Sequence, residues 1–144
     1  MAAVDDLDEV IERFDLAQAE FVKGNPEPMT RLFSHREDVT LNNPLSPPAH
    51  GWVQVAATME RASSQFRDGE ITSFEITEKH VTPELAYVVR VERAKAKVGG
   101  REDVAPITLR VTMIFRPEDG AWKVVHRHAD PITTPQPAES VLQQ

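Results

Sequence analysis

The sequence predicts an α+β fold in which three N-terminal helices pack on one face of a curved antiparallel sheet. Apolar side chains recur at helical spacing in the first half of the chain, whereas apolar and polar side chains alternate in the second half. Clusters of Gly, Pro and Asp divide the second half into four runs. Helices followed by consecutive strands are typical of an α+β domain.

A first helix is predicted over residues 4–23, and Gly24 ends it because glycine readily adopts the conformation that closes a helix. Asn25 and Pro26 begin a short second helix, since Asn caps a helix N-terminus and Pro suits the first turn. The apolar stripe of the first helix consists of Val4, Leu7, Ile11, Phe14, Ala17 and Phe21.

The segment between the second and third helices is predicted to hold a brief strand over residues 38–41. A loop over residues 42–51 follows, and its prolines make it stiff. Trp52 begins the third helix, which is expected to end at Asp68 and Gly69.

Alternation predicts four long strands in the rest of the domain, which is expected to span residues 1–130. The tail, residues 131–144, is rich in proline and polar side chains, so we expect it to be extended or disordered and to lie along a partner subunit. The predicted strands cover about residues 71–81, 85–97, 104–116 and 121–130.

Composition excludes several classes of function. The chain has 144 residues and a net charge of −7, so nucleic acid and anionic membrane surfaces are not expected partners. It has no cysteine, which excludes disulfides and thiolate chemistry. The N-terminus is acidic rather than apolar and no run reaches membrane-spanning length, so a cytoplasmic protein is expected.

The turn at residues 118–120 decides which side chains share a sheet face. A three-residue turn pairs Thr112 with His126 and Arg110 with His128, whereas a two-residue turn would shift the register by one. The face against the helices must be apolar to form the core, so the aliphatic set is expected inside. The expected inner set includes Tyr87, Val89, Met113 and Arg127, and the expected outer polar network comprises Arg90, Glu92, Arg110 and Thr112 with His126 and His128.

His126 and His128 are the candidate catalytic residues, because alternation places them with Asp130 on one strand face. Glu92 or Asp130 could hold one of these imidazoles as a general base, and a carboxylate beside them would raise the histidine pKa. The same three side chains could ligate a metal, but nearby Arg110 would repel a cation, so we expect neither metal nor cofactor. The alternative is a network that steadies a sheet interface.

A ligand pocket is expected beneath the sheet, with a small apolar molecule as its occupant. Arg127 could bind a ligand carboxylate or extend to the rim, and Asn43 could orient a carbonyl or only close the proline turn. The candidate ligand-binding residues are Asn43, Trp52, Met59, Tyr87, Val89, Met113 and Arg127.

The order of elements resembles the nuclear transport factor 2-like superfamily, in particular its SnoaL-like and ketosteroid isomerase-like members. The resemblance covers residues 4–130 and is most specific at residues 21–25 (FVKGN), 38–44 (DVTLNNP) and 119–130 (DGAWKVVHRHAD). The last segment also resembles the end of the association domain of calmodulin-dependent kinase. The resemblance implies a cystatin-like cone, a pocket between sheet and helices, and usually a homodimer through the sheet.

The resemblance to ketosteroid isomerase does not extend to the catalytic residues of that enzyme. Asn43 stands where the family resemblance places the general-base aspartate, before the proline of the first short strand. Ala17 stands where it places the oxyanion-hole tyrosine, and the protonated aspartic acid falls near Thr108. Steroid isomerisation is therefore not expected.

Two classes of function fit these patterns. The first is a SnoaL-like protein with an apolar cone pocket for a small molecule, on which it could perform lyase, isomerase or cyclase acid–base chemistry. The second is a non-catalytic module for dimerisation or ligand sequestration.

Overall fold

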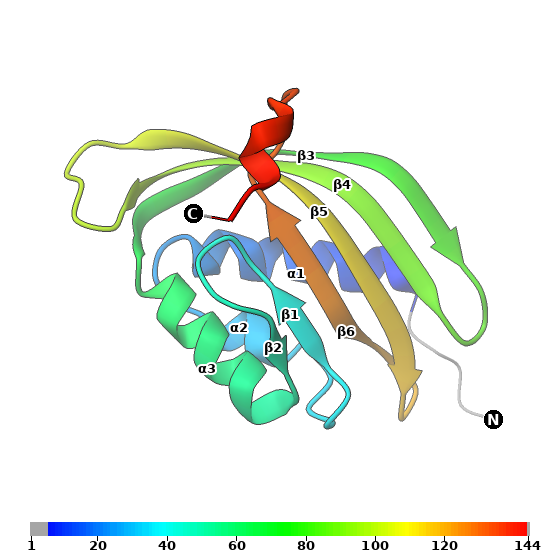
Figure 1. The fold of residues 1–144 in the computed structure, drawn as a ribbon. Helices are drawn as coiled ribbons and strands as arrows, with labels where there is room; N and C mark the ends of the chain where they lie inside the picture. Colours follow the sequence, from blue (N-terminus) through cyan, green and yellow to red (C-terminus); the bar gives the residue numbers. More distant parts are fainter. Residues whose placement is uncertain (1–5, 144) are drawn as a thin grey trace.

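The computed structural model describes residues 6–143 and confirms the α+β fold class (Figure 1). The expected start of the first helix at Val4 lies outside the described residues. The helices are α1 (Leu7–Phe21), α2 (Glu27–Thr30), α3 (Trp52–Ser63) and a short 3-10 helix, η1 (Ala138–Val141). The strands are β1 (Thr40–Asn42), β2 (Ala49–His50), β3 (Phe66–Val81), β4 (Ala86–Val98), β5 (Ala105–Glu118) and β6 (Ala121–Asp130).

The ends of α1 are fixed by local chemistry. The Asp6 carboxylate accepts a hydrogen bond from the backbone N–H of Asp8 at 2.8 Å, which satisfies one of the free donors at the N-terminus. Gly24, three residues after the last helical residue, has a φ of +99°, as expected of the residue that turns the chain away. The buried side of α1 carries Leu7, Val10, Ile11, Phe14, Ala17 and Gln18.

One six-stranded sheet contains all the strands, in the order β2-β1-β6-β5-β4-β3. The long strands arch over α1, and α3 lies beside β1 and β2 (Figure 1). The sheet is antiparallel except where β1 runs parallel to β6. The β2 strand falls in the segment that we expected to be only loop. Its two residues are paired because the proline loop folds back as a hairpin onto β1.

A β-bulge in β6 corrects both predicted registers of the last hairpin. The turn has two residues, so Trp122 pairs with Pro117, but the extra residue Val125 then shifts the rest of the strand. His126 therefore pairs with Ile114 rather than with Thr112 or Met113. Trp122 and Val124 turn inward with Arg127 and Ala129, although strict alternation places them on opposite faces.

The facing of β4 is the reverse of the prediction. Arg90 pairs with Val111 and Glu92 with Leu109, so both charged side chains point toward the helices and are buried. Tyr87 and Val89, which we expected inside, are on the outer face. The prediction assumed that the inner face is apolar apart from Arg127, but buried charges are tolerated where they neutralise one another.

The edge strand β3 begins at Phe66, earlier than the predicted residue 71, because α3 already ends at Ser63. Its start packs closely on the end of α1. A Cβ atom on Gly69 would lie 2.1 Å from the carbonyl oxygen of Val22, so only glycine fits there.

The tail after β6 is exposed as far as residue 143, and it contains η1. Residues 6–143 include no helix long and apolar enough to cross a membrane.

Candidate functional site

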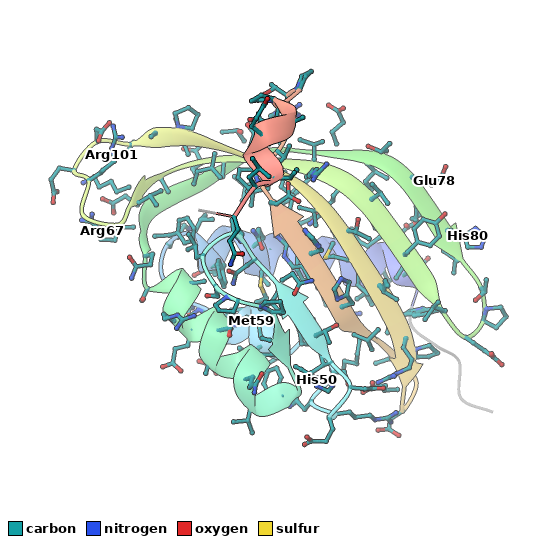
Figure 2. The ribbon with its side chains drawn as sticks, viewed as in Figure 1. His50, Met59, Arg67, Glu78, His80 and Arg101 are labelled. Atoms are coloured by element: carbon teal, nitrogen blue, oxygen red, sulfur yellow. The ribbon has the colours of Figure 1, made fainter. Side chains whose placement is uncertain are left out.

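The main cavity lies between the inner face of the sheet and the three helices and has a volume of about 220 Å³. Its walls are mostly apolar. Met59 comes from α3 and lies between that helix and the sheet (Figure 2). The other apolar lining residues include Phe21, Val22, Met29, Phe33, Leu41, Phe66, Ile71, Ala94, Ile107 and Leu109.

A buried ion pair forms the polar part of the cavity wall. Arg127 on β6 reaches across β5 to Glu92 on β4, with Nη2 2.7 Å from Oε1 and Nη1 3.0 Å from Oε2. This two-point geometry is the strongest arrangement of a guanidinium and a carboxylate. Both side chains line the cavity, and both are almost fully buried.

Arg90 and Asp15 complete the charged network. Arg90 Nε donates to Glu92 Oε2 at 2.9 Å, and Arg90 Nη1 donates to Asp15 Oδ1 at 2.6 Å. The Arg90 guanidinium also lies 4.2 Å from the ring centre of Phe74, a cation–π contact. Two arginines thus face two carboxylates, and the network has no net charge when all four are ionised.

The pKa values of the two acids reflect their different surroundings. Burial acts to raise the pKa of Glu92, but the charges and hydrogen bonds of Arg127 and Arg90 outweigh it and hold this pKa below the usual value. Burial raises the pKa of Asp15 above the usual value, and the single contact with Arg90 only partly opposes this effect. Glu92 is therefore a poor proton acceptor.

Gln18 on α1 lies beside this ion pair and also lines the cavity. Its Nε2 donates to Glu92 Oε1 at 3.3 Å. Its Oε1 is buried and accepts no hydrogen bond from any residue in the described range 6–143. Gln18 therefore holds one unpaired acceptor beside the ion pair, at the polar end of the cavity.

Three of the seven candidate ligand-binding residues line the cavity: Asn43, Met59 and Arg127. The Asn43 Oδ1 accepts a hydrogen bond from the backbone N–H of Leu45 at 2.9 Å, so the side chain also closes the proline turn. Arg127 is buried and paired, so its guanidinium neither extends to the rim nor stands free for a ligand carboxylate.

The other four candidates do not line the cavity. Trp52 stacks on His35 with ring centres 3.8 Å apart, and Met113 lies in the core, where its sulfur is 3.5 Å from Arg127 Nη1. Tyr87 and Val89 are on the outer face because the facing of β4 was predicted wrongly. The cavity lies where the helices and the sheet diverge. Alternation along a strand predicts which face a side chain is on, but not where the layers separate.

The two candidate catalytic histidines are on the outer face, away from the cavity. His126 Nδ1 is 2.7 Å from Thr40 Oγ1, and His128 Nε2 is 3.1 Å from Asp130 Oδ2. Arg110 Nε donates to Asp130 Oδ1 at 2.7 Å. The two histidines, Arg110 and Asp130 border a shallow hollow, which is also lined by Val89, Val111, Thr112 and Ile114.

The predicted outer network is therefore only partly correct. Arg110 and Thr112 accompany the histidines, but Arg90 and Glu92 are on the other side of the sheet. Glu92 thus cannot hold either histidine as a general base. The pKa of His126 is below its usual value because of burial and the neighbouring His128, which is opposite to the predicted direction. Within residues 6–143, no cluster of three or more histidine, cysteine or acidic side chains is arranged to hold a metal.

Sequence reasoning missed Gln18 and Asp15 altogether. Gln18 follows Phe14 by four residues and precedes Phe21 by three, so it belongs to the apolar stripe of the first helix. A polar side chain on that stripe was the available signal for a buried polar site. Asp15 has no comparable signal, because it borders the stripe like a solvent-facing residue.

Comparison with solved structures places this molecule among the nuclear transport factor 2-like cone folds. A superfamily member from Salmonella enterica serovar Typhimurium LT2 has a TM-score of 0.73 at 18% identity, over 91% of this chain and 92% of that one. A ketosteroid isomerase-like protein from Erwinia carotovora atroseptica has a TM-score of 0.70 at 18% identity, over 88% and 96%. At these identities the likeness shows the fold alone.

The family model for the SnoaL-like domain matches residues 10–133, so the chain belongs to the SnoaL-like domain family. The resemblance identified from the sequence is thereby confirmed. No curated protein matches the sequence.

We predict that Glu92→Gln strongly destabilises the protein. The substitution keeps the shape of the side chain but leaves Arg127 buried without its carboxylate and Arg90 with Asp15 alone. Losing one partner of a buried pair typically costs about 3–5 kcal/mol. Chemical denaturation measures the change. Glu75→Gln is the matched control, because Glu75 pairs with Arg93 at an exposed site and should lose under about 1 kcal/mol. Equal losses in the two variants would contradict the role of the network.

We also predict that stability rises with pH across the histidine range. The folded-state pKa of His126 is lowered, so as pH falls below about 6.5 the unfolded state takes up a proton before the folded state does. The contribution of His126 is therefore fully present above that pH and is lost as pH falls toward its folded-state pKa. Melting temperatures from pH 5 to 8 should show this slope, and His126→Gln should reduce it. His50→Gln, at the exposed residue of β2, is the control. If the melting temperature of His126→Gln depends on pH as strongly as that of the unsubstituted protein, the effect arises from other groups.

Proposed function

We propose that this protein binds a small, largely apolar molecule in the cone cavity. The observation that carries the proposal is the cavity itself, about 220 Å³ of space bordered almost entirely by apolar side chains in an otherwise packed core. Protein interiors are normally close-packed, and concave apolar sites with a few polar groups are the usual form of ligand sites. Leu45, half-exposed at the border of the cavity with Pro44 and Pro131, supports an entrance on that side.

Binding is better supported than acid–base catalysis. The ionisable groups that line the cavity are Glu92 and Arg127, and they neutralise each other. The two candidate histidines border the hollow on the other side of the sheet. Asn43, in the position where ketosteroid isomerase has its base, cannot accept a proton at neutral pH. We therefore favour a ligand-binding or ligand-sequestering role over lyase, isomerase or cyclase chemistry.

Ethylbenzene is a suitable probe, because an apolar cavity of about 150 Å³ is enough to hold benzene. We predict saturable binding by calorimetry and a higher melting temperature, since a ligand at a hundred times its dissociation constant adds about 2.7 kcal/mol of stability. Ala94→Leu would fill part of the cavity and should weaken binding by about tenfold or more. Lys95→Leu, the next residue on β4 and exposed, should leave binding unchanged. Absence of binding by ethylbenzene, 4-ethylphenol and 4-ethylbenzoate to the unsubstituted protein would refute the proposal.

We also propose that two copies of the chain associate through the outer face of the sheet. The apolar side chains of Val88, Trp122 and Val124 are buried inside the cone and cannot contribute to this contact. The remaining support is the outward row of Tyr87, which is 36% exposed, with half-buried Val89 and Val91 beside it and Ile114 on the next strand. An exposed apolar row on a sheet face favours association.

Light scattering at micromolar concentration should give about twice the 16.1 kDa chain mass. Val89→Lys should shift the species toward monomer, because a charge would lie unpaired in the contact. Glu78→Lys, on the exposed edge strand β3, should leave the mass unchanged. A single species of monomer mass in the unsubstituted protein would exclude this mode of association.

A further inference from the structure

Gln18 is the feature of the cavity that the charged network does not explain. It is 6% exposed, lines the cavity and has a buried Oε1 that accepts no hydrogen bond within the described residues. A buried acceptor without a donor is unfavourable, because it has lost its hydrogen bonds to water and gained none. A ligand that supplies the donor would remove this penalty on binding.

The orientation of the Gln18 amide follows from its neighbour. Glu92 is ionised and can only accept hydrogen bonds, so the group that faces Glu92 Oε1 at 3.3 Å must be the amide nitrogen. The reverse orientation would place two acceptors against each other. The amide oxygen is therefore the unpaired atom of Gln18, and because it has almost no accessible surface, a ligand donor reaches it only as the amide turns toward the cavity.

The ion pair argues against a charged ligand. Glu92 already accepts hydrogen bonds from Gln18, Arg90 and Arg127, so a cationic ligand would compete with two arginines for it. A ligand carboxylate would have to displace Glu92 from the fork of Arg127. Either ligand would also lose its own hydration in an apolar cavity without gaining a free partner of opposite charge.

We propose that the cavity takes an uncharged molecule with a hydroxyl or N–H group that donates a hydrogen bond to Gln18 Oε1. This inference rests on the proposed function and specifies its ligand class: an alcohol, phenol or secondary amide on a compact apolar body. The apolar body contacts residues such as Phe21, Met59 and Leu109, while the donor lies at the polar end beside the ion pair.

The test uses three probes that share the ethylbenzene skeleton and differ only in the group opposite the ethyl chain. They are ethylbenzene, 4-ethylphenol and 4-ethylbenzoate, all at neutral pH. Dissociation constants are measured by calorimetry for the unsubstituted protein and for Gln18→Met, which keeps the length of the side chain but removes the acceptor. The ratio of the dissociation constant of ethylbenzene to that of 4-ethylphenol should be roughly two- to tenfold larger in the unsubstituted protein than in Gln18→Met. This is the range expected for one neutral hydrogen bond. Comparing ratios cancels the cost of dehydrating the phenol. Gln65→Met, at an exposed glutamine, should leave the ratio unchanged.

A second measurement needs no variant, in case Gln18→Met does not fold. The side-chain amide carbon of Gln18 should change its NMR shift when 4-ethylphenol is added, and should change less with ethylbenzene.

The outcomes separate this inference from the proposed function. Equal ratios in the two proteins, no selective shift of Gln18, or tighter binding of 4-ethylbenzoate than of 4-ethylphenol would each overturn the inference while binding in the cavity stands. Failure of all three probes to bind would overturn the inference and the proposed function together.

Discussion

The interior of this cone depends on a single carboxylate. Glu92 holds two arginines that come from different strands, and Asp15 on α1 supplies the second negative charge. The four groups are each expensive to bury, but together they carry no net charge and nearly all their hydrogen bonds are made inside the network. The helix and two strands must therefore keep one relative position, since sliding α1 by one turn would separate Asp15 and Gln18 from their partners.

This network also explains how the cavity can be apolar although charged side chains border it. The guanidinium of Arg127 is committed to Glu92 and lies near the Phe14 ring, with 5.4 Å between them. Its charge is thus compensated before any ligand arrives. The wall that a ligand meets is mostly apolar, and its two charged groups are already paired, which favours selection by shape over selection by charge.

The elements were predictable from the sequence because their signals are local. Helical spacing, Gly24 and the Asp119–Gly120 turn mark boundaries without knowledge of the rest of the fold. The facing of the strands was less predictable, because it depends on partners far apart in the sequence. The charged side chains of Arg90 and Glu92 suggest a solvent-facing side of β4. Their burial is explained only by Asp15 and Arg127, which pair with them from distant parts of the sequence. The sequence placed Asn43, Met59 and Arg127 at the pocket, and they do line the cavity. Gln18 was not predicted, because its significance appears only when Glu92 is seen beside it.

The extra residue in β6 has a consequence for how the interior of such a protein can diverge. Val125 sets the phase of the second half of the strand, so every side chain from His126 to Asp130 takes its facing from that one insertion. A β6 strand of the same sequence without the bulge would pair Val125 with Ile114 and His126 with Met113, and would present the histidines to the cavity and Arg127 to the outside. Two proteins of this architecture could thus have nearly identical strand sequences and opposite interior chemistry. An alignment that places one gap wrongly would assign the cavity residues of one to the surface of the other.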